Sequence, residues 1–263
     1  MKKKLQKLIG LVHSIYMSKP LPTKVAIYFH QLDDPSYGLF VDTIKYLDGL
    51  GYEFVNNFGY ANADPFKKVV NISFDDNYSN WLRAIPVFKK VNGVGVFYVN
   101  SEVLDVSAST ELAKQYYKKI NKNINQRPLT KCELLQLSDA GHEIGAHTHS
   151  HPNLAELNES DIDLELGQNI AELSAVIGQD IYSFSYPFGM PRNCPANIWS
   201  ILTKHDIRYM AHGAPGMQFA GSSEAEIQRS VFRSSMSLEK NLKALSVDGK
   251  FFVNMFGLSP AEL

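Results

Sequence analysis

Short runs rich in β-branched and aromatic residues alternate with helical patterns along most of this chain, and this alternation limits its fold more than any other feature. Strand patterns occur at residues 24–29, 69–74, 95–99, 143–146, 182–186, 207–210 and 227–232. Helical patterns lie between or after them, at residues 40–50, 81–91, 130–140, 161–177, 196–205 and 238–247. Strands that alternate with helices predict βα units and a parallel sheet covered by helices.

The chain length favours closing such units into one barrel. The 263 residues show no internal repeat and no low-complexity linker, and a barrel of βα units takes about 250 residues. We therefore expect a single α/β domain of the (β/α) barrel type at residues 23–263, preceded by an N-terminal amphipathic segment at residues 1–22.

That segment has two interpretations. Its apolar residues follow helical spacing, with lysines elsewhere on the helix; they are Leu5, Leu8, Ile9, Val12 and Tyr16. The stripe suits packing against the domain itself, and residues 1–17 would also suit peripheral contact with an anionic membrane surface. We expect no cleaved signal peptide, because the apolar stretch is short and no small-residue cleavage site follows it. The expected location is cytoplasmic, with contact to the inner membrane as an option.

Charge and composition exclude several classes of protein. The chain has 26 Lys and Arg against 27 Asp and Glu, a formal net charge of −1, so we expect no nucleic-acid partner bound by bulk positive charge. No apolar run approaches the roughly 20 residues of a membrane span. The two cysteines are too few for a disulfide framework. An enzyme or a ligand-binding domain fits these features.

Two adjacent carboxylates, Asp75 and Asp76, follow the strand pattern that ends at Phe74. In parallel α/β folds the catalytic and ligand-binding residues lie where strands end. One carboxylate at such a point can bind a cation while the other takes a proton from a molecule that the cation holds. Alternatively, one Asp caps the next helix and the other is solvated.

A histidine cluster closes another strand pattern. His147, His149 and His151 are three of the chain's eight histidines, and neutral imidazole is a common zinc ligand. Pro152 opposes a long helix here, so a tight turn is expected. A solvated polar loop is the alternative, and His149 is the member expected to point outward.

Together, the two clusters predict a metal centre. Asp76, His147 and His151 would supply one oxygen and two nitrogens and leave a position for water, which is typical of catalytic rather than structural zinc sites. Asp75 is then the natural base for that water. A His₂Asp set also suits cobalt, nickel, manganese or iron. A third segment, Tyr186-Pro187-Phe188-Gly189, ends another strand and could offer backbone amides to an oxyanion, although such a sequence is often only a turn.

These segments resemble a known family. The stretches are Ser-Phe-Asp-Asp-Asn-Tyr at 73–78, Gly-His-Glu-Ile-Gly-Ala-His-Thr-His-Ser-His-Pro-Asn-Leu at 141–154 and Phe-Ser-Tyr-Pro-Phe-Gly at 184–189. In order and spacing they are similar to the polysaccharide deacetylases, the NodB-homology domain of carbohydrate esterase family 4, over residues 25–245. Tyr28-Phe29-His30 resembles the Tyr-His strand end of the branch with exopolysaccharide and poly-N-acetylglucosamine deacetylases, with one residue inserted.

The resemblance implies a deformed (β/α) barrel that hydrolyses N-acetyl groups on sugars with one divalent metal ion, zinc being the first choice. It implies that Asp75 is the base and that Asp76, His147 and His151 hold the metal. It also implies that the Phe188 amide binds the oxyanion, beside Tyr186, and that His30 protonates the leaving amine. A histidine pKa near 6.5 suits this last task, although a hydrogen-bonded structural role for His30 stays open.

The chain departs from the family pattern at two positions. Asn77 stands where the family has Gly, so we expect it to adopt the left-handed turn and to place its side chain near the substrate. Ser185 stands where many members carry an Arg that pairs with the base, and Arg192 is the candidate substitute. The segment 208–219, with His212, is expected to form the rim.

Three functional hypotheses follow. The first is a metal-dependent hydrolase that removes the N-acetyl group from an aminosugar of a bacterial surface polysaccharide or its precursor, including nucleotide- or lipid-linked forms. The second is a deacylase for another acyl group, N-formyl or O-acetyl. The third is a catalytically impaired glycan-binding domain. The partner in each is an acylated aminosugar or glycan, and the oligomeric state is not indicated.

Overall fold

A computed structural model describes residues 21–120, 127–214 and 225–245. The predicted amphipathic segment at residues 1–17 lies outside these residues, so its packing and the boundary at residues 22–23 stay predictions. Among the described residues no helix has the length and apolar character that crossing a membrane requires.

The described residues form one sheet of nine strands, and every pair of neighbouring strands is parallel. Along the sheet the order is β8-β7-β6-β5-β4-β3-β1-β9, with β2 also beside β3. The strands are β1 (Lys24–Phe29), β2 (Glu53–Phe54), β3 (Val69–Asp76), β4 (Val96–Val99), β5 (Glu143–Ala146), β6 (Ser183–Ser185), β7 (Tyr209–His212), β8 (Glu226–Gln228) and β9 (Ser230–Val231).

The sheet closes almost completely into a barrel at Arg229. This residue alone separates β8 from β9, yet β8 pairs with β7 and β9 pairs with β1. The two ends of the sheet therefore meet where the chain passes through Arg229. The single strand predicted at residues 227–232 is wrong in this respect, because it is two short strands with different neighbours. The predicted deformed (β/α) barrel is confirmed.

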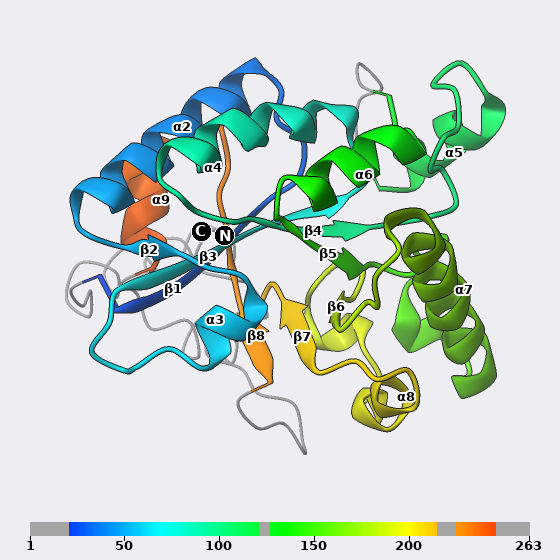
Figure 1. The fold of residues 1–263 in the computed structure, drawn as a ribbon. Coiled ribbons are helices and arrows are strands. Elements are labelled where there is room, and N and C mark those ends of the chain that lie inside the picture. The colour runs from blue at the N-terminus through cyan, green and yellow to red at the C-terminus, as the bar shows by residue number, and fades with distance from the viewer. Residues whose placement is uncertain (1–20, 121–126, 215–224, 246–263) are drawn as a thin grey trace, which may run out of the picture.

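Helices surround the strands (Figure 1). They are α2 (Asp34–Gly49), α3 (Asn57–Ala61), α4 (Ile85–Lys90), α5 (Glu111–Lys119), α6 (Lys131–Asp139), α7 (Glu159–Ile177), α8 (Ile198–Lys204) and α9 (Leu238–Leu245). The capping box predicted at Thr130 is present, with Glu133 as its partner. Gly178 ends α7 in the left-handed conformation, with φ of 68°, as expected for a glycine stop signal.

The region predicted as one helix at residues 81–91 is divided. A 3-10 turn at Ser79–Ala84 precedes α4, and Pro86 stands in the first turn of α4. Proline lacks the N–H that a helix interior needs but is tolerated at a helix start. Pro86 therefore marks a helix start within the predicted segment.

Strand β3 carries the site on a fully buried backbone. All eight of its residues are buried, as expected for a central strand of a parallel sheet covered by helices. Phe74 packs against Phe97 with ring centroids 4.7 Å apart and against Phe40 of α2 at 5.6 Å. Burial of each such side chain contributes about 1.5–3 kcal/mol, so the core fixes the position of the residues that follow Phe74.

Candidate active site

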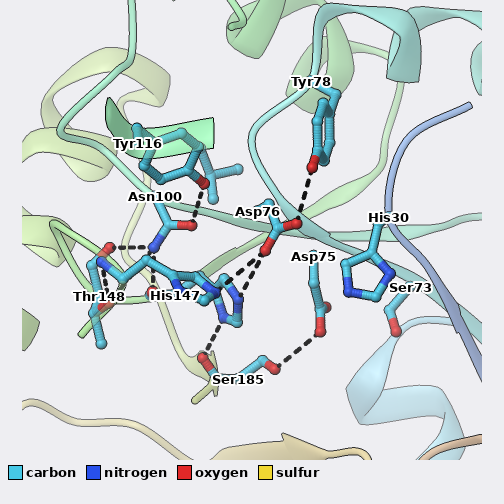
Figure 2. A network of polar contacts seen from close by, with 12 residues as sticks. His30, Ser73, Asp75, Asp76, Tyr78, Asn100, Tyr116, His147, Thr148 and Ser185 are labelled. Carbon is cyan, nitrogen blue, oxygen red and sulfur yellow. Dashed lines mark hydrogen bonds and ion pairs between the residues drawn. The ribbon is translucent and has the colours of Figure 1, made fainter. Parts of the chain in front are cut away.

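His30, Asp75, Asp76 and His147 lie close together (Figure 2), each at or directly after the end of a strand. Asp75 and Asp76 are the last residues of β3, and His147 follows β5 directly. In the described part of the chain, tertiary structure brings together one group of three side chains that could hold a metal ion, namely Asp76, His147 and His151, and all three are buried.

The spacing of these three side chains suits a metal ion. The Asp76 Oδ1 atom lies 3.6 Å from His147 Nε2 and 3.4 Å from His151 Nε2. These distances exceed those of normal hydrogen bonds, about 2.7–3.2 Å. Tetrahedral ligands at about 2.0–2.1 Å from zinc lie about 3.4 Å from one another. The donor set therefore fits a tetrahedral divalent cation.

Hydrogen bonds orient two of the three donors. The Nδ1 atom of His147 lies 2.5 Å from the Ser185 carbonyl oxygen, and since a carbonyl only accepts, Nδ1 carries the proton. The Nε2 lone pair of His147 thus faces Asp76. On the carboxylate, the Tyr78 hydroxyl donates to Oδ2 at 3.2 Å, which leaves Oδ1 facing the imidazoles.

Packing orients the third donor. His151 lies edge-on to the Phe188 ring, with centroids 4.9 Å apart, and its Nδ1 atom is buried without a hydrogen-bond partner among the described residues. Burial lowers the pKa of His151 below its ordinary value, although Asp76 acts in the opposite direction. The neutral imidazole is the form that binds metals.

The loop that carries the histidines has an uncommon backbone that buried amides stabilise. Thr148 and His151 have φ of 67° and 58°, and non-glycine residues adopt such angles mainly where surrounding contacts impose them. Asn100 donates to the His147 and Thr148 carbonyls. From α7, the Asn169 Oδ1 atom accepts the His147 N–H at 2.9 Å.

Asn169 also ties this loop to β4. Its Nδ2 donates to the Val99 carbonyl and to Ser101 Oγ, both at 3.0 Å. Sequence reasoning missed Asn169, although a signal exists: it occupies a buried position on the stripe of α7 with Ile162, Leu166 and Leu173. A polar side chain on such a stripe indicates a specific hydrogen-bonding role.

Asp75 forms a buried, bidentate ion pair with Arg229. Arg229 Nη1 and Nη2 each lie 2.7 Å from an Asp75 carboxylate oxygen, and the same two atoms also donate to Ser73 Oγ and Ser185 Oγ. Arg229 is fully buried. Burial alone would raise the pKa of Asp75, but the charge and hydrogen bonds of Arg229 outweigh it and lower this pKa. The carboxylate is therefore ionised and held in one orientation.

Arg229 corrects the expectation for Arg192. Arg192 is exposed, on a 3-10 turn at Pro191–Asn193, whereas the guanidinium on Asp75 comes from the junction of β8 and β9. Ser185 accepts a hydrogen bond from that guanidinium at 2.7 Å. The sequence carries a signal for Arg229, since it is the charged residue within the strand pattern at 227–232.

His30 lies beside both carboxylates. It follows β1 directly, and the Trp81 indole donates to its carbonyl at 2.7 Å, which fixes the backbone. His30 contributes to lowering the pKa of Asp75 and Asp76, and its ring points toward Asp75 (Figure 2).

A cavity of about 90 Å³ opens between these groups. Its wall includes His30, Asp75, Asp76, His147, His151 and Phe188. Phe188 has φ of 66°, and its side chain is 47% exposed, so it lies at the mouth rather than in the core. Among the described residues no acceptor binds its backbone N–H.

Two predicted substrate contacts are not found. Asn77 is fully buried and does not line the cavity; its side chain donates to the Asn100 carbonyl and accepts from the Leu129 N–H. The positive φ predicted for Asn77 belongs instead to Asp76, at 87°. Tyr186 is also fully buried, and its hydroxyl donates to the Gly189 carbonyl at 3.2 Å. Both residues stabilise loops around the site.

Two other histidines singled out from the sequence, His149 and His212, do not line the cavity. His149 points outward as predicted, with its Nδ1 atom 3.0 Å from Ser101 Oγ and 3.1 Å from Glu172 Oε2. His212, predicted on the rim, is fully buried: it stacks on Tyr186, and its Nε2 atom lies 3.6 Å from Glu226 Oε2. Its ring therefore packs against the segment 184–189 rather than facing the substrate.

Comparison with solved structures shows the same fold in several deacetylases. The chain superposes on the deacetylase PplD of Streptococcus pyogenes, solved with acetate, with a TM-score of 0.65 and 18% identity over 87% of this chain and 99% of that one. For IcaB of Ammonifex degensii the TM-score is 0.65 and the identity 17%, over 86% and 96%. For the putative polysaccharide deacetylase BA0330 of Bacillus anthracis the TM-score is 0.65 and the identity 18%, over 85% of this chain and 68% of that one.

Sequence comparison identifies the family. No curated protein matches the chain. The profile of the polysaccharide deacetylase family, however, matches residues 62–210, which is more than half of the chain. That range contains Asp75, Asp76, His147 and His151. The chain belongs to the polysaccharide deacetylase family and is therefore a hydrolase of carbon–nitrogen bonds, the class that the sequence predicted.

Proposed function

We propose that this protein is a divalent-metal-dependent N-deacetylase that acts on an acetylated aminosugar of a bacterial surface polysaccharide or of its precursor. One observation carries the proposal. An Asp76 carboxylate oxygen lies 3.4–3.6 Å from one nitrogen of each of the two imidazoles, His147 and His151. A second carboxylate, Asp75, is held ionised beside them by Arg229.

Asp76, His147 and His151 are the proposed metal ligands. A divalent cation held there would polarise the substrate carbonyl and lower the pKa of a bound water. Zinc is the first choice, and cobalt, nickel, manganese and iron suit the same donor set. The Tyr78 and Ser185 contacts orient Asp76 and His147 as is usual for hydrogen-bond partners of metal ligands.

Asp75 is the proposed general base. Its low pKa keeps it unprotonated near neutral pH, and it lines the cavity where the water and the acyl carbon would meet. Arg229 gives the carboxylate one fixed orientation through its two parallel hydrogen bonds. Proton transfer depends on this geometry before it depends on basicity.

His30 is the proposed general acid, and the Phe188 amide is the proposed oxyanion donor. An amide bond breaks readily only when the amine leaves protonated, and an imidazole can supply that proton near neutral pH. The Phe188 N–H, in the segment 184–189, has no acceptor among the described residues. Such a backbone donor would stabilise the developing negative charge. The cavity of about 90 Å³ suits a small acyl group.

The test is acetate release from a panel of N-acetylated aminosugars and their oligomers by protein loaded with zinc. We expect acetate, while formate release from N-formyl sugars, or acetate only from O-acetyl sugars, would support the second hypothesis. Changing Asp75 to Asn or His30 to Ala should each lower kcat by about 100-fold or more, since general acid–base groups contribute about 10²–10⁴-fold. Binding of sugars without any hydrolysis would instead favour a glycan-binding domain.

A matched pair of control variants comes from the surface. His205 and Asp163 form a partly exposed pair 2.8 Å apart, and neither residue lines the cavity with the proposed ligands. His205→Ala and Asp163→Asn make the same chemical changes and should leave kcat unaltered.

Cytoplasmic location, with residues 1–17 on the inner membrane surface, is also proposed, and fractionation of cells that express the tagged chain tests it.

A further inference from the structure

A second cavity adjoins the site and shares one wall with it. It has a volume of about 320 Å³ and lies between the end of β1, the first turn of α2 and the segment after β9. His30 lines both this cavity and the one with the metal ligands. A substrate whose amide lies at Asp75 and which extends past His30 would reach this space.

The lining of this cavity is cationic and rich in hydroxyl groups. Arg233 supplies a positive charge, and Ser36, Ser234 and Ser235 supply hydroxyls, with the Gln31 amide beside them. Of the described residues that line it, none is acidic.

The nearby carboxylates are already bound. Asp33 accepts hydrogen bonds from Gln31 Nε2 and from the Ser36 N–H. Asp34 pairs with Arg83 at 2.9 Å. Neither carboxylate is paired with Arg233 in the structure.

The segment that carries Arg233 is held rigidly by one buried side chain. Asn241 of α9 is fully buried and accepts the Arg233 N–H at 3.0 Å. Its Nδ2 donates to the carbonyls of Arg233, Met236 and Ser237 at 3.1–3.2 Å. Ser234 Oγ also lies 3.3 Å from Ser36 Oγ of α2. Binding groups held in place before the ligand arrives lose less entropy on binding.

The floor of the cavity distinguishes between two kinds of ligand. Phe29 and Phe232 lie beneath it and are 1% and 4% exposed, so neither presents an aromatic face on which a sugar ring could stack. A guanidinium with several hydroxyl groups and no acidic neighbour in the wall suits an anion with several oxygen atoms, and arginine is well matched to phosphate.

We propose that this cavity is a subsite for a phosphoryl group on the sugar substrate, with Arg233 as its main contact. This inference rests on the proposed function, because it takes the amide at Asp75 as the reacting group. It narrows the substrate class to an acylated aminosugar that carries a phosphate ester or phosphodiester. Specificity for such a substrate would come from the segment 233–235 rather than from the metal ligands.

Two measurements test the subsite. Isothermal titration calorimetry compares N-acetylglucosamine with its 1-phosphate, its 6-phosphate and its 1-(methyl phosphate), and the same four compounds serve as substrates. We expect at least one phosphorylated sugar to bind ten-fold or more tightly than N-acetylglucosamine. Arg233→Ala should lower that preference ten-fold or more, because the charged hydrogen bonds between the guanidinium and the phosphoryl group are lost. Arg233→Glu should abolish it, and Arg233→Lys should restore part of it.

The control variant is Arg208→Ala. Arg208 is an exposed arginine that stacks on Tyr182 at 4.3 Å, and its removal should leave the preference unchanged. Hydrolysis without any preference for phosphorylated sugars, or a preference that Arg233→Ala does not alter, overturns the subsite while the proposed function stands. Arg233-dependent binding of a phosphorylated sugar without hydrolysis supports the subsite and overturns the proposed function. Absence of binding by all four sugars overturns the subsite.

Discussion

The ion pair of Asp75 and Arg229 should be strongly coupled in stability as well as in function. The Asp75 side chain is 7% exposed and the Arg229 side chain 0%, with the charged atoms 2.7 Å apart. At an effective dielectric constant of about 20, Coulomb's law gives about 6 kcal/mol of attraction at this separation. The cost of burying both charges offsets part of that energy, so we expect a net coupling of about 3 kcal/mol.

A double-mutant cycle measures this coupling. Arg229→Met leaves the Asp75 carboxylate buried without its partner, and Asp75→Asn does the same to the guanidinium. Each single change should lower the free energy of unfolding by about 3–5 kcal/mol. The double variant buries no unpaired charge in this pair, so its loss should be about 3 kcal/mol smaller than the sum of the single losses. Urea unfolding followed by circular dichroism gives the four free energies.

The exposed pair of Arg83 and Asp34 is the matched control. Its charged atoms are 2.9 Å apart, but the Asp34 side chain is 92% exposed, so its coupling should be about 0–1 kcal/mol. If the two single losses in free energy of unfolding sum to the loss of the double variant to within about 0.5 kcal/mol, the argument that burial makes this pair strong is refuted. If Arg229→Met does not fold, Arg229→Gln also removes the charge, and the cycle is repeated with it.

Three further predictions concern the metal centre and the core. Removing the metal with a chelator should lower the Tm, and adding zinc should restore it, because a ligand that binds the folded state stabilises it; His147→Ala should show neither shift in a thermal scan. Asn169→Leu should weaken zinc binding about 10–100-fold, as is typical for partners behind metal ligands, whereas Leu166→Met on the same face of α7 should not, and competition with a chromogenic chelator measures both. Burial lowers the pKa of His142 to about 4. As the pH falls, this imidazole is therefore protonated near pH 6.5 in the unfolded chain but only near pH 4 in the folded protein. Stability should therefore fall by about 3 kcal/mol as the pH drops from 6.5 to 4, and a His142→Asn variant that keeps this slope in urea unfolding would contradict the assignment.

Local patterns in the sequence predicted much of the barrel. The strands at 24–29 and 143–146 agree with β1 and β5 at both ends, and the capping box at Thr130 begins α6. These features depend on neighbours within a few residues, where residue type and spacing decide. Very short elements escaped notice, among them β2 at Glu53–Phe54 and α3 at Asn57–Ala61, because they contain too few residues for a period to repeat.

The proposed metal ligands could also be predicted from the sequence, because their positions follow from where strands end. Asp76 ends β3 and His147 directly follows β5 of the same parallel sheet, and the carboxyl ends of parallel strands meet at one face. The sequence did not predict how side chains are oriented on the turns that follow these strands. Asn77 was expected to face the substrate, yet its side chain joins Asn100 to Leu129 in the interior, because the preceding residue, Asp76, takes the positive φ.

The amino-acid order by itself determined which chemical groups the protein carries and which strand ends they occupy. Only the closed barrel decided which arginine neutralises Asp75. Arg229 is 154 residues away along the chain and enters the interior where β8 passes into β9 and the two edges of the sheet meet. The physical reason is that an ion pair of this kind depends on the distance between charges in space, and that distance follows from strand pairing across the whole sheet rather than from any local pattern.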